Sequence, residues 1–523
     1  MRSPHRVDIK AIIDELGRQA VHLQEQRLAL IDEIRADPSY NNDVQNAPPI
    51  PEVEYSYQND LSFYQPRQYQ LSETVLNLMQ RVLVVEASLL RIREKTAELD
   101  ALIAPIQVLP DEVLGVMFEV TSRPESEPSK SSYISWDSER RVPLPIILAS
   151  VSRRWRHVAL SRSSLWTNIY LTPWQPRTWT ELALSRSDSQ LLDVTIDYCT
   201  EYGPKAAALD DLLDIVFPRI AYWKSLKIVT HHVSVLSHVA IRLQNAYAPN
   251  LTSLRLSLTG SGPPGNQLIS LPLILQGGAP ALSRLHVDSV GVAWLSRPFE
   301  GLTVLDLRWL WSDTKLSYQQ LRGLLAASPS LRKLVLRGLY VELNPAVCYP
   351  SIQISSLVSL ELSGDNVSFM RTLLDVPALE ELSLVNVDEA EYRELMRSFD
   401  PPTRRSYPHL RTLSYLNVRT TPSMERFFEA IPDLELLTIV HSAVTRFLPI
   451  LSNPRGFLPK LQTLTVLDDA PEQILLETVL NRKEMGYPLQ RLNVHAGSMS
   501  AHYIGLLQQH VKLDGIYFRD RSR

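Results

Sequence analysis

The segment 377–384 reads PALEELSL and places leucine at three positions, 379, 382 and 384. The same spacing, apolar-x-x-apolar-x-apolar, occurs ten times between residues 251 and 494. The copies begin at Leu251, Leu282, Leu302, Leu331, Leu357, Leu379, Leu410, Leu434, Leu461 and Leu489, with two weaker ones before them at Leu191 and Trp223. Successive copies among the ten lie 20 to 31 residues apart. Because no single unit of this size can bury its own leucines, the pattern predicts a solenoid with one continuous core.

Proline stands two residues before the first apolar position in seven of the ten copies. The seven are Pro249, Pro280, Pro329, Pro377, Pro408, Pro432 and Pro459. Proline ends a helix and fixes a backbone angle that suits extended chain. Helical segments are visible between the copies, for example at 318–327, 369–374 and 424–430. We therefore expect each unit to run from a helix through a proline stop into a short strand.

This repeat, with its L-x-x-L-x-L strand, resembles the leucine-rich repeat family over roughly residues 220 to 518. One feature of the family is missing. The asparagine or cysteine expected eight positions after the first leucine is replaced in every copy, and typical occupants are Leu310, Asp365, Ser442 and Gly497. Without that side-chain ladder we expect a less regular curvature. The resemblance implies a surface that binds other proteins, because a repeat arc offers a broad face and no closed pocket.

The composition of the 523 residues limits the classes of function. The 53 Lys and Arg residues against 57 Asp and Glu leave a net charge of −4, which gives no electrostatic case for a nucleic-acid or membrane-surface protein. Two cysteines, Cys199 and Cys348, are too few for a disulfide scaffold or a cysteine-rich zinc module. Residues 1–10 lack a signal-peptide core, and no apolar run reaches membrane-spanning length. We expect a soluble protein in the cytoplasm, the nucleus or both.

Residues 105–118, PIQVLPDEVLGVMF, combine a Leu-Pro step with an amphipathic helix. Pro110 followed by two acidic residues is typical of a helix N-terminus. Val113, Leu114, Met117 and Phe118 then share one apolar face at helical spacing. The polar stretch that follows, 119–141, predicts a surface loop.

Residues 145–160, PIILASVSRRWRHVAL, predict a second helix. Leu148, Val151, Trp155 and Val158 share one face of it, and the three arginines lie off that face. Arginines on one helix face usually form only a solvated surface, so we assign them no phosphate-binding role. The segment closes with Ser-Leu-Trp at 164–166.

Leu-Pro-x-Glu-x-Leu, a Val-x-Arg-Arg-Trp helix and Leu-Trp, in this order, resemble the F-box. With the repeats behind them, they resemble the large family of fungal F-box proteins with C-terminal leucine-rich repeats. Ser152 replaces the cysteine common in the family, and the loop between the first two helices is longer than in most members. The resemblance implies a three-helix domain that docks on the Skp-family adaptor of a cullin-based ubiquitin ligase. The matching apolar positions, each of which either contacts the adaptor or packs in the helical core, are Leu109, Pro110, Val113, Leu114, Phe118, Leu148, Val151 and Trp155.

Residues 71–103 carry side chains at alternating steps of four and three, the spacing of a coiled-coil seam, and nine of the ten seam positions are apolar. A shorter seam at 9–34 is interrupted by Arg27. Between them, residues 37–70 are rich in Pro, Asn, Gln and Tyr and predict a flexible connector. Two arrangements fit these seams. The helices fold back as an antiparallel hairpin, which satisfies both seams in one molecule, or the second helix pairs with another chain.

Motifs of catalysis are missing from the sequence. It contains no phosphate-binding G-x-x-x-x-G-K-[ST] loop, no G-x-S-x-G elbow and no H-E-x-x-H helix. Neither Cys199 nor Cys348 has a histidine or a basic cluster near it in the sequence, so an inert thiol is expected rather than a nucleophile. We therefore expect no enzyme, no cofactor and no metal site, although a site scattered over solenoid loops would leave no local signature.

These observations define one expected organisation, an α/β repeat protein. Heptad helices occupy 1–104, an F-box-like helical domain occupies 105–170, and a leucine-rich-repeat-like solenoid occupies 171–523. The leading hypothesis is a non-catalytic substrate receptor of an SCF-type ubiquitin ligase. Its partners would be the Skp-family adaptor, a cullin held through it, and a target protein that the sequence does not identify. The alternative is a repeat scaffold that binds proteins outside any ligase.

Overall fold

The structure is a computed structural model of the chain. It describes residues 4–41, 72–103, 106, 109–122, 142–199, 206–259, 273–292, 299–310, 316–338, 341–342, 349–364, 367–397, 407–418, 424–440, 444–453, 456–467, 470–495 and 499–516. The chain divides into two compact units, Met1–Met117 and Phe118–Arg523, and the division falls within helix α4 (Asp111–Ser122). None of the helices in the described ranges is long and apolar enough to cross a membrane.

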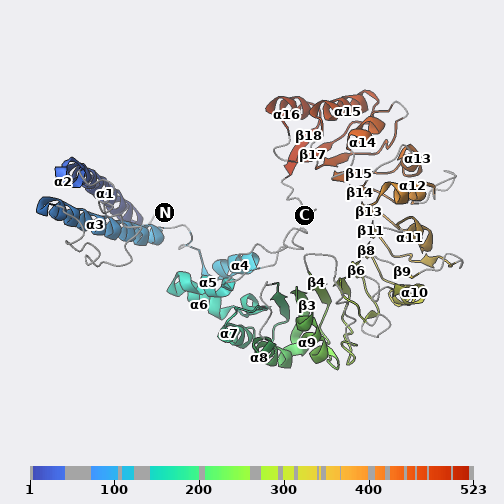
Figure 1. Cartoon of the computed structure of the whole chain (residues 1–523), viewed down its shortest axis with the longest axis horizontal. Helices are drawn as coiled ribbons and strands as arrows, with labels where there is room; N and C mark the ends of the chain where they lie inside the picture. Colours follow the sequence, from blue (N-terminus) through green and yellow to red (C-terminus); the bar gives the residue numbers. More distant parts are fainter. Residues whose placement is uncertain are drawn as a thin grey trace. The chain divides into compact units, whose positions relative to one another are not determined.

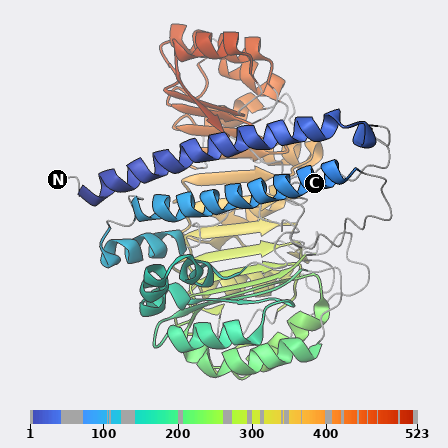
Figure 2. The same cartoon turned by 90° about the vertical axis from the view of Figure 1, so that its left-hand side faces the viewer.

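The first unit contains two long helices, α1 (Pro4–Ala36) and α3 (Glu73–Ile103), with the short α2 (Pro38–Asn41) between them. α1 and α3 lie side by side (Figure 2). Their seams meet in one core, formed by Leu30, Ile31, Ile34, Val75, Leu78, Met79, Val82, Val85 and Leu89. Because the end of α1 packs on the start of α3, the two seams satisfy each other as an antiparallel hairpin within one chain.

Arg27, which interrupts the first seam, has a partner on the other helix. Its guanidinium forms an ion pair with the Glu86 carboxylate, and the two side chains are only 16% and 11% exposed. A charge at this depth is tolerated because an opposite charge meets it. The interruption in the sequence pattern is therefore a specific cross-helix contact.

The beginning of the expected connector is structured. Residues 38–41 form α2, and Asp37 accepts hydrogen bonds from the Ser39 backbone (2.8 Å) and from the Ser72 hydroxyl (3.2 Å). These bonds tie the end of α1 to the residue that precedes α3. The remainder of the connector, 42–70, and the first seam residue, Leu71, lie outside the described residues.

In the described part of the second unit, 14 strands form one parallel sheet and pair in chain order. They are β1 (Asn168–Leu171), β2 (Leu192–Tyr198), β3 (Trp223–Thr230), β4 (Ser253–Leu258), β5 (Arg284–Asp288), β6 (Val304–Arg308), β8 (Lys333–Arg337), β11 (Ser359–Ser363), β13 (Glu381–Val385), β14 (Thr412–Leu416), β15 (Leu436–Val440), β16 (Thr463–Val466), β17 (Arg491–His495) and β18 (Lys512–Ile516). All twelve copies of the sequence pattern, weak ones included, form strands, and β1 and β18 extend the sheet at its two ends.

Helices connect many of the strands and lie along the outer side of the arc that the strands form (Figure 1). They are α7 (Arg177–Arg186), α8 (Ala206–Val216), α9 (Val233–Leu243), α10 (Tyr318–Ala326), α11 (Val367–Leu373), α12 (Glu389–Arg397), α13 (Met424–Ala430), α14 (Val444–Leu451), α15 (Glu472–Glu484) and α16 (Ala501–Gln508). Two short strand pairs, β7 (Leu316–Ser317) with β9 (Val341–Glu342) and β10 (Ile352–Gln353) with β12 (Leu374–Asp375), lie outside the main sheet. We call residues 168–516 the repeat array.

The leucines of the pattern set the register of the sheet. Leu382 on β13 pairs with Leu360 on β11 and with Leu413 on β14. The same column is buried from Ile169 on β1 to Leu492 on β17, and its side chains belong to one hydrophobic core that extends through the described residues of the array. Since neighbouring residues of a strand point to opposite faces, the residues between these leucines lie on the other face of the sheet. We call it the inner face.

The prolines of the pattern lie in hydrogen-bonded turns. The sequence predicted them only as residues that end a helix. Around Pro377, the amide of Leu379 donates to the carbonyl of Val376 at 3.3 Å. In all seven copies that contain a proline, the amide two residues after the proline donates to the carbonyl of the residue before it. Proline suits the second position of such a turn because its ring already fixes the required φ. In these seven copies proline therefore favours the turn that leads into the strand.

Backbone hydrogen bonds connect the repeats at the carboxyl ends of the strands, near the positions where the family's asparagine is missing. The residue directly after six strands has a positive φ: Ser289, Trp309, Gly338, Gly364, Asn386 and Asn417. Each donates its amide to the carbonyl of the last residue of the following strand, over N···O distances of 2.7 to 3.2 Å. This backbone ladder joins neighbouring repeats without an asparagine at the expected position.

Candidate functional site

Helix α4 has two apolar faces, and only one of them is buried. Asp111 and Glu112 occupy its first turn, where negative charge favours the positive end of the helix dipole. Leu114 and Phe118 are buried. On the exposed side lie four apolar side chains at helical spacing, Val113, Val116, Met117 and Val120, which are 43%, 52%, 42% and 57% exposed. We call these four residues the α4 stripe.

Specific contacts hold the end of α4. Glu119 accepts hydrogen bonds from Arg162 at 3.3 Å and from the Ser164 hydroxyl at 2.8 Å. The Phe118 ring packs against the Trp155 ring with centroids 4.8 Å apart. The prediction that the surface loop begins at residue 119 is therefore wrong, because α4 continues to residue 122 and Glu119 serves as its anchor. Residues 123–141 of that loop lie outside the described residues.

The predicted second helix is two helices, α5 (Leu144–Val151) and α6 (Arg153–Ser161). Ser152 separates them in an extended conformation, and its hydroxyl accepts a hydrogen bond from the Trp155 amide at 3.1 Å. Serine favours this capping position because its side chain satisfies an amide that the helix leaves free. The break removes Val151 from the face that it was expected to share with Trp155 and leaves it 56% exposed.

The structure divides the eight apolar residues predicted for adaptor binding. Leu114, Phe118 and Leu148 are buried; Leu109 and Trp155 are intermediate; Pro110, Val113 and Val151 are exposed. The site prediction omitted other exposed apolar residues, namely Val116, Met117, Val120 and Ile147. Their spacing was the available signal, because 113, 116, 117 and 120 follow the i, i+3, i+4, i+7 rule of one helical face.

A second candidate surface is the inner face of the repeat array, which is charged over strands β5 to β11. The Asp306 carboxylate accepts a hydrogen bond from His286 Nδ1 at 2.8 Å and two from Arg308 at 2.7 Å. Burial alone raises the pKa of Asp306, but these hydrogen bonds outweigh it and lower the pKa below its usual value. Arg337 forms an ion pair with Glu361 on the neighbouring strand. Asp306 and Arg308, and likewise Arg337 and Glu361, thus neutralise each other on this face.

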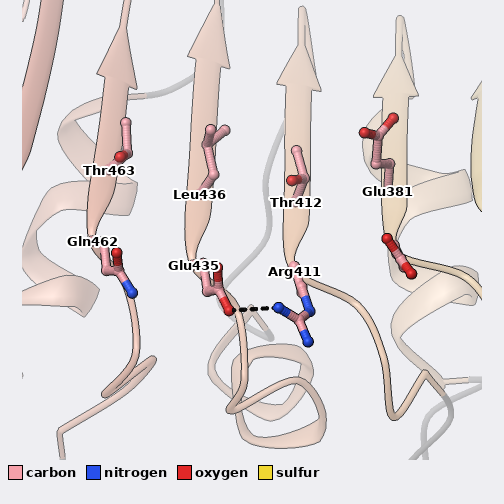
Figure 3. Close-up of a pocket in the computed structure, with 8 residues that line it drawn as sticks. Glu381, Arg411, Thr412, Glu435, Leu436, Gln462 and Thr463 are labelled. Carbon is pink, nitrogen blue, oxygen red and sulfur yellow. Dashed lines mark hydrogen bonds and ion pairs between the residues drawn. The ribbon is translucent and has the colours of Figure 1, made fainter.

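The inner face changes character over strands β13 to β16. The positions that correspond to Asp306 and Glu361 hold Ser383, Ser414, Thr438 and Thr465. At the start of the same strands lies a shallow hollow of about 250 Å³, lined by residues that include Glu381, Arg411, Glu435 and Gln462 (Figure 3). Arg411 donates to Glu435 across 3.3 Å. The lining of the hollow is mainly polar.

Among the described residues no group of three His, Cys, Asp or Glu side chains could hold a metal ion. Burial raises the pKa of the Cys199 thiol to about 12, and its sulfur lies 3.3 Å from the Thr259 hydroxyl. At neutral pH this cysteine is a thiol, which is a poor nucleophile. Cys348 lies outside the described residues.

Comparison with known proteins gives little additional guidance. No family model and no curated protein matches the chain. Among solved structures, 28 chains are similar to it. One belongs to the crystal structure of the Rad7 and Elc1 complex in yeast, with 16% sequence identity over 84% of this chain and 98% of that chain, and a TM-score of 0.25. A TM-score this low supports no conclusion about function.

Proposed function

We propose that this chain is a non-catalytic substrate-recognition subunit of an SCF-type (Skp–cullin–F-box) ubiquitin ligase. On this proposal the α4 stripe docks the Skp-family adaptor, which connects the chain to a cullin. The repeat array binds a target protein, and ubiquitin transfer is accelerated by proximity while other subunits supply the chemistry. The α4 stripe is the observation that carries the proposal.

A single exposed apolar side chain needs no explanation, since folded proteins expose many of them. Four on one face of one helix are different, because they form a continuous apolar strip of the kind that marks a protein interface. The i, i+3, i+4, i+7 spacing of Val113, Val116, Met117 and Val120 is also the spacing of a helix that lies in a partner's apolar groove. The contacts of Glu119 hold the end of this helix before any partner binds, which lowers the entropic cost of docking.

The sequence adds the identity of the expected partner. The F-box resemblance begins at Leu109 and Pro110, directly before α4, and continues through Trp155 and Trp166. Trp166 is buried and donates its indole N–H to the Ala159 carbonyl at 2.9 Å, so the last part of the motif has a structural role next to strand β1. The array has parallel strands, buried columns of leucine and helices on one side of its sheet. These features support its classification as leucine-rich repeats.

A binding experiment tests this function. The full chain and the Skp-family adaptor from the same source are mixed, and the dissociation constant is measured by calorimetry. We expect a value below about 1 μM, which corresponds to about −8 kcal/mol. The variant Val116→Ser with Val120→Ser should bind at least tenfold more weakly, because it places two hydroxyls in the docked face.

The matched control is Val21→Ser with Leu28→Ser, which alters two apolar residues of α1 that are 61% and 51% exposed. This control should bind the adaptor as the unaltered chain does. Equal loss in both variants, or no loss in the α4 variant, contradicts docking through the α4 stripe. Absence of adaptor binding by a well-folded chain favours the alternative, a repeat scaffold that acts outside the ligase.

A further inference from the structure

Helix α3 has a second apolar side, in addition to the seam that packs on α1. Leu76, Leu83 and Leu90 follow one another at steps of seven residues, and Val84 and Ala87 lie between them at steps of three and four. This spacing places all five residues on one side of the helix. None of them belongs to the buried core that α3 shares with α1. We call these five residues the α3 stripe.

The α3 stripe is accessible from outside the hairpin. Val84 is 62% exposed and Leu90 is 41% exposed, Ala87 is exposed, and Leu76 and Leu83 are half-buried. A surface helix of a soluble protein normally carries polar residues opposite its buried face, whereas a helix that is apolar on several sides is buried among partners. Since α1 covers only the seam of α3, the stripe requires a further cover.

The other helix of the hairpin shows the ordinary arrangement. On the side of α1 that faces away from its seam lie Asp14, Arg18, Glu25 and Asp32, all exposed and separated by steps of four and seven residues. The two helices thus differ on their outward sides, because α1 meets solvent with charges and α3 presents leucines. A continuous exposed apolar strip of this kind marks an interaction surface.

The core of the hairpin is small for helices of this length. α1 has 33 residues and α3 has 31, while the core found among the described residues consists of nine buried apolar side chains close to the turn. Pairs of helices commonly complete such a core by packing on a second pair, which gives a four-helix bundle. A second copy of this chain brings a pair of helices with an identical uncovered stripe.

The charges beside the α3 stripe favour a second copy that runs in the antiparallel direction. Glu73 and Arg91 are 18 residues apart, which is five full turns, so both lie on the same side of the helix. Leu83 lies between them, 10 residues after Glu73 and 8 before Arg91. Two α3 helices that cross antiparallel at Leu83 therefore bring each Glu73 close to Arg91 of the other copy. A parallel pair would instead bring Glu73 to Glu73 and Arg91 to Arg91, and like charges at an interface repel.

We infer that the α3 stripe is the contact surface between two copies of this chain. The two α3 helices pack antiparallel with Leu83 near the two-fold axis, and each α1 covers the outer side of its own α3. The contact is closed, because in a two-fold dimer the same patch of each copy meets itself and no free patch remains for a third copy. This inference does not depend on adaptor docking through the α4 stripe, so either can fail without the other.

Sedimentation equilibrium of the full chain tests the inference, because it measures mass directly. We expect a species of twice the 59.4 kDa of one chain, with a dissociation constant below about 1 μM. The variant Val84→Gln with Leu90→Gln should dissociate at least about tenfold more readily, because each copy loses two apolar side chains from the contact. A chain that still has the mass of one copy at about 100 μM overturns the inference.

The matched control is Val21→Gln with Leu28→Gln. It changes the same two residue types on α1, where they are 61% and 51% exposed and lie outside the α3 stripe. This control should form the dimer as the unaltered chain does, and circular dichroism should show the same helix content in both variants. Equal weakening in the two variants overturns the inference. A loss of thermal stability in the α3 variant that is independent of chain concentration would assign the stripe to a contact within one chain, and this outcome also overturns it.

A charge exchange tests the antiparallel direction and leaves the stripe intact. Arg91→Glu should weaken the dimer about fivefold, because it places like charges at both ends of the contact. Glu73→Arg with Arg91→Glu should restore the dimer, since opposite charges meet again in the antiparallel pair. In a parallel pair the second substitution restores nothing, so a double variant as weak as Arg91→Glu overturns the antiparallel arrangement. Both measurements are made at low salt, where exposed charges are least screened.

Discussion

The repeat array and helix α4 both contain apolar residues at regular spacing, but these residues are buried in the array and exposed to solvent on α4. In the array, pattern residues such as Leu360, Leu413 and Leu437 are at most 1% exposed, because they lie in the core on one side of the sheet. On α4, Val116 and Val120 are more than half exposed, because no described element covers them. The comparison shows that apolar periodicity identifies a face that requires a cover, and that the cover comes either from the chain itself or from a partner.

The largest effect should come from the array. Leu413→Ala removes a fully buried side chain from the centre of the leucine column and should lower the free energy of unfolding by about 4 kcal/mol. Denaturant unfolding followed by circular dichroism measures it. A loss below 1 kcal/mol would show that the column is loosely packed and would weaken the contrast with α4.

A smaller effect with a defined pH dependence is expected at Asp306. Its pKa is lower in the folded chain than in the unfolded chain, where it is about 3.9. The carboxylate therefore stabilises the fold fully above that value, and the contribution is lost as the pH falls through the folded pKa.

Asp306→Asn leaves Arg308 without its partner and should cost about 3 kcal/mol at pH 7. The difference from the unaltered chain should shrink once the pH is below about 4. Unfolding free energies at pH 7, 5 and 3 test this. A difference that stays constant over this range would show that ionisation of Asp306 does not support the inner face.

The backbone ladder should respond at Gly338, whose φ is +57°. A Cβ atom there would overlap the Trp309 ring, so Gly338→Ala should cost about 2 kcal/mol through strain and overpacking. Gly301→Ala is the control, because its φ is also positive but nothing lies within 4 Å of the added carbon. Equal shifts of the thermal midpoint in both variants would show that the ring contact is unimportant.

The smallest effect on stability is expected on α4. Val116→Ala removes an exposed side chain and should change the free energy of unfolding by less than about 0.5 kcal/mol. The same variant should measurably weaken adaptor binding. A stability loss like that of Leu413→Ala would mean that the α4 stripe is covered within the chain, and the contrast between α4 and the repeat array would disappear.

The strands could be predicted because their signal is local and repeated. Each copy contains its leucines within six residues, and the turn before it contains proline in seven copies. β1 and β18 escaped the prediction because each contains only part of the pattern, with Ile169 and Leu513 in the shared column. The sequence did not predict the break at Ser152, because the apolar periodicity of a helix continues across it. The capping hydrogen bond that starts α6 depends on one hydroxyl, which leaves no periodic signal.

The candidate sites were less predictable, because exposure is a property of the packed chain. Leu114 and Val113 are adjacent and similar in chemistry, yet one is buried and the other is 43% exposed. Val82 and Val84 belong to one apolar run of α3, and only the packing of α1 decides that Val82 is buried while Val84 is 62% exposed. Nothing in the local sequence distinguishes these two valines.

The sequence by itself determined the repeat, its strand positions and its core, because spacing and residue type decide which side chains must leave water. The hairpin pairing of α1 with α3 and the uncovered faces of α3 and α4 were decided only in the tertiary structure. These features depend on which surfaces meet after the chain has folded. Strand register and helix packing set the distances between the side chains of these features, and they bring together residues that are far apart in the sequence.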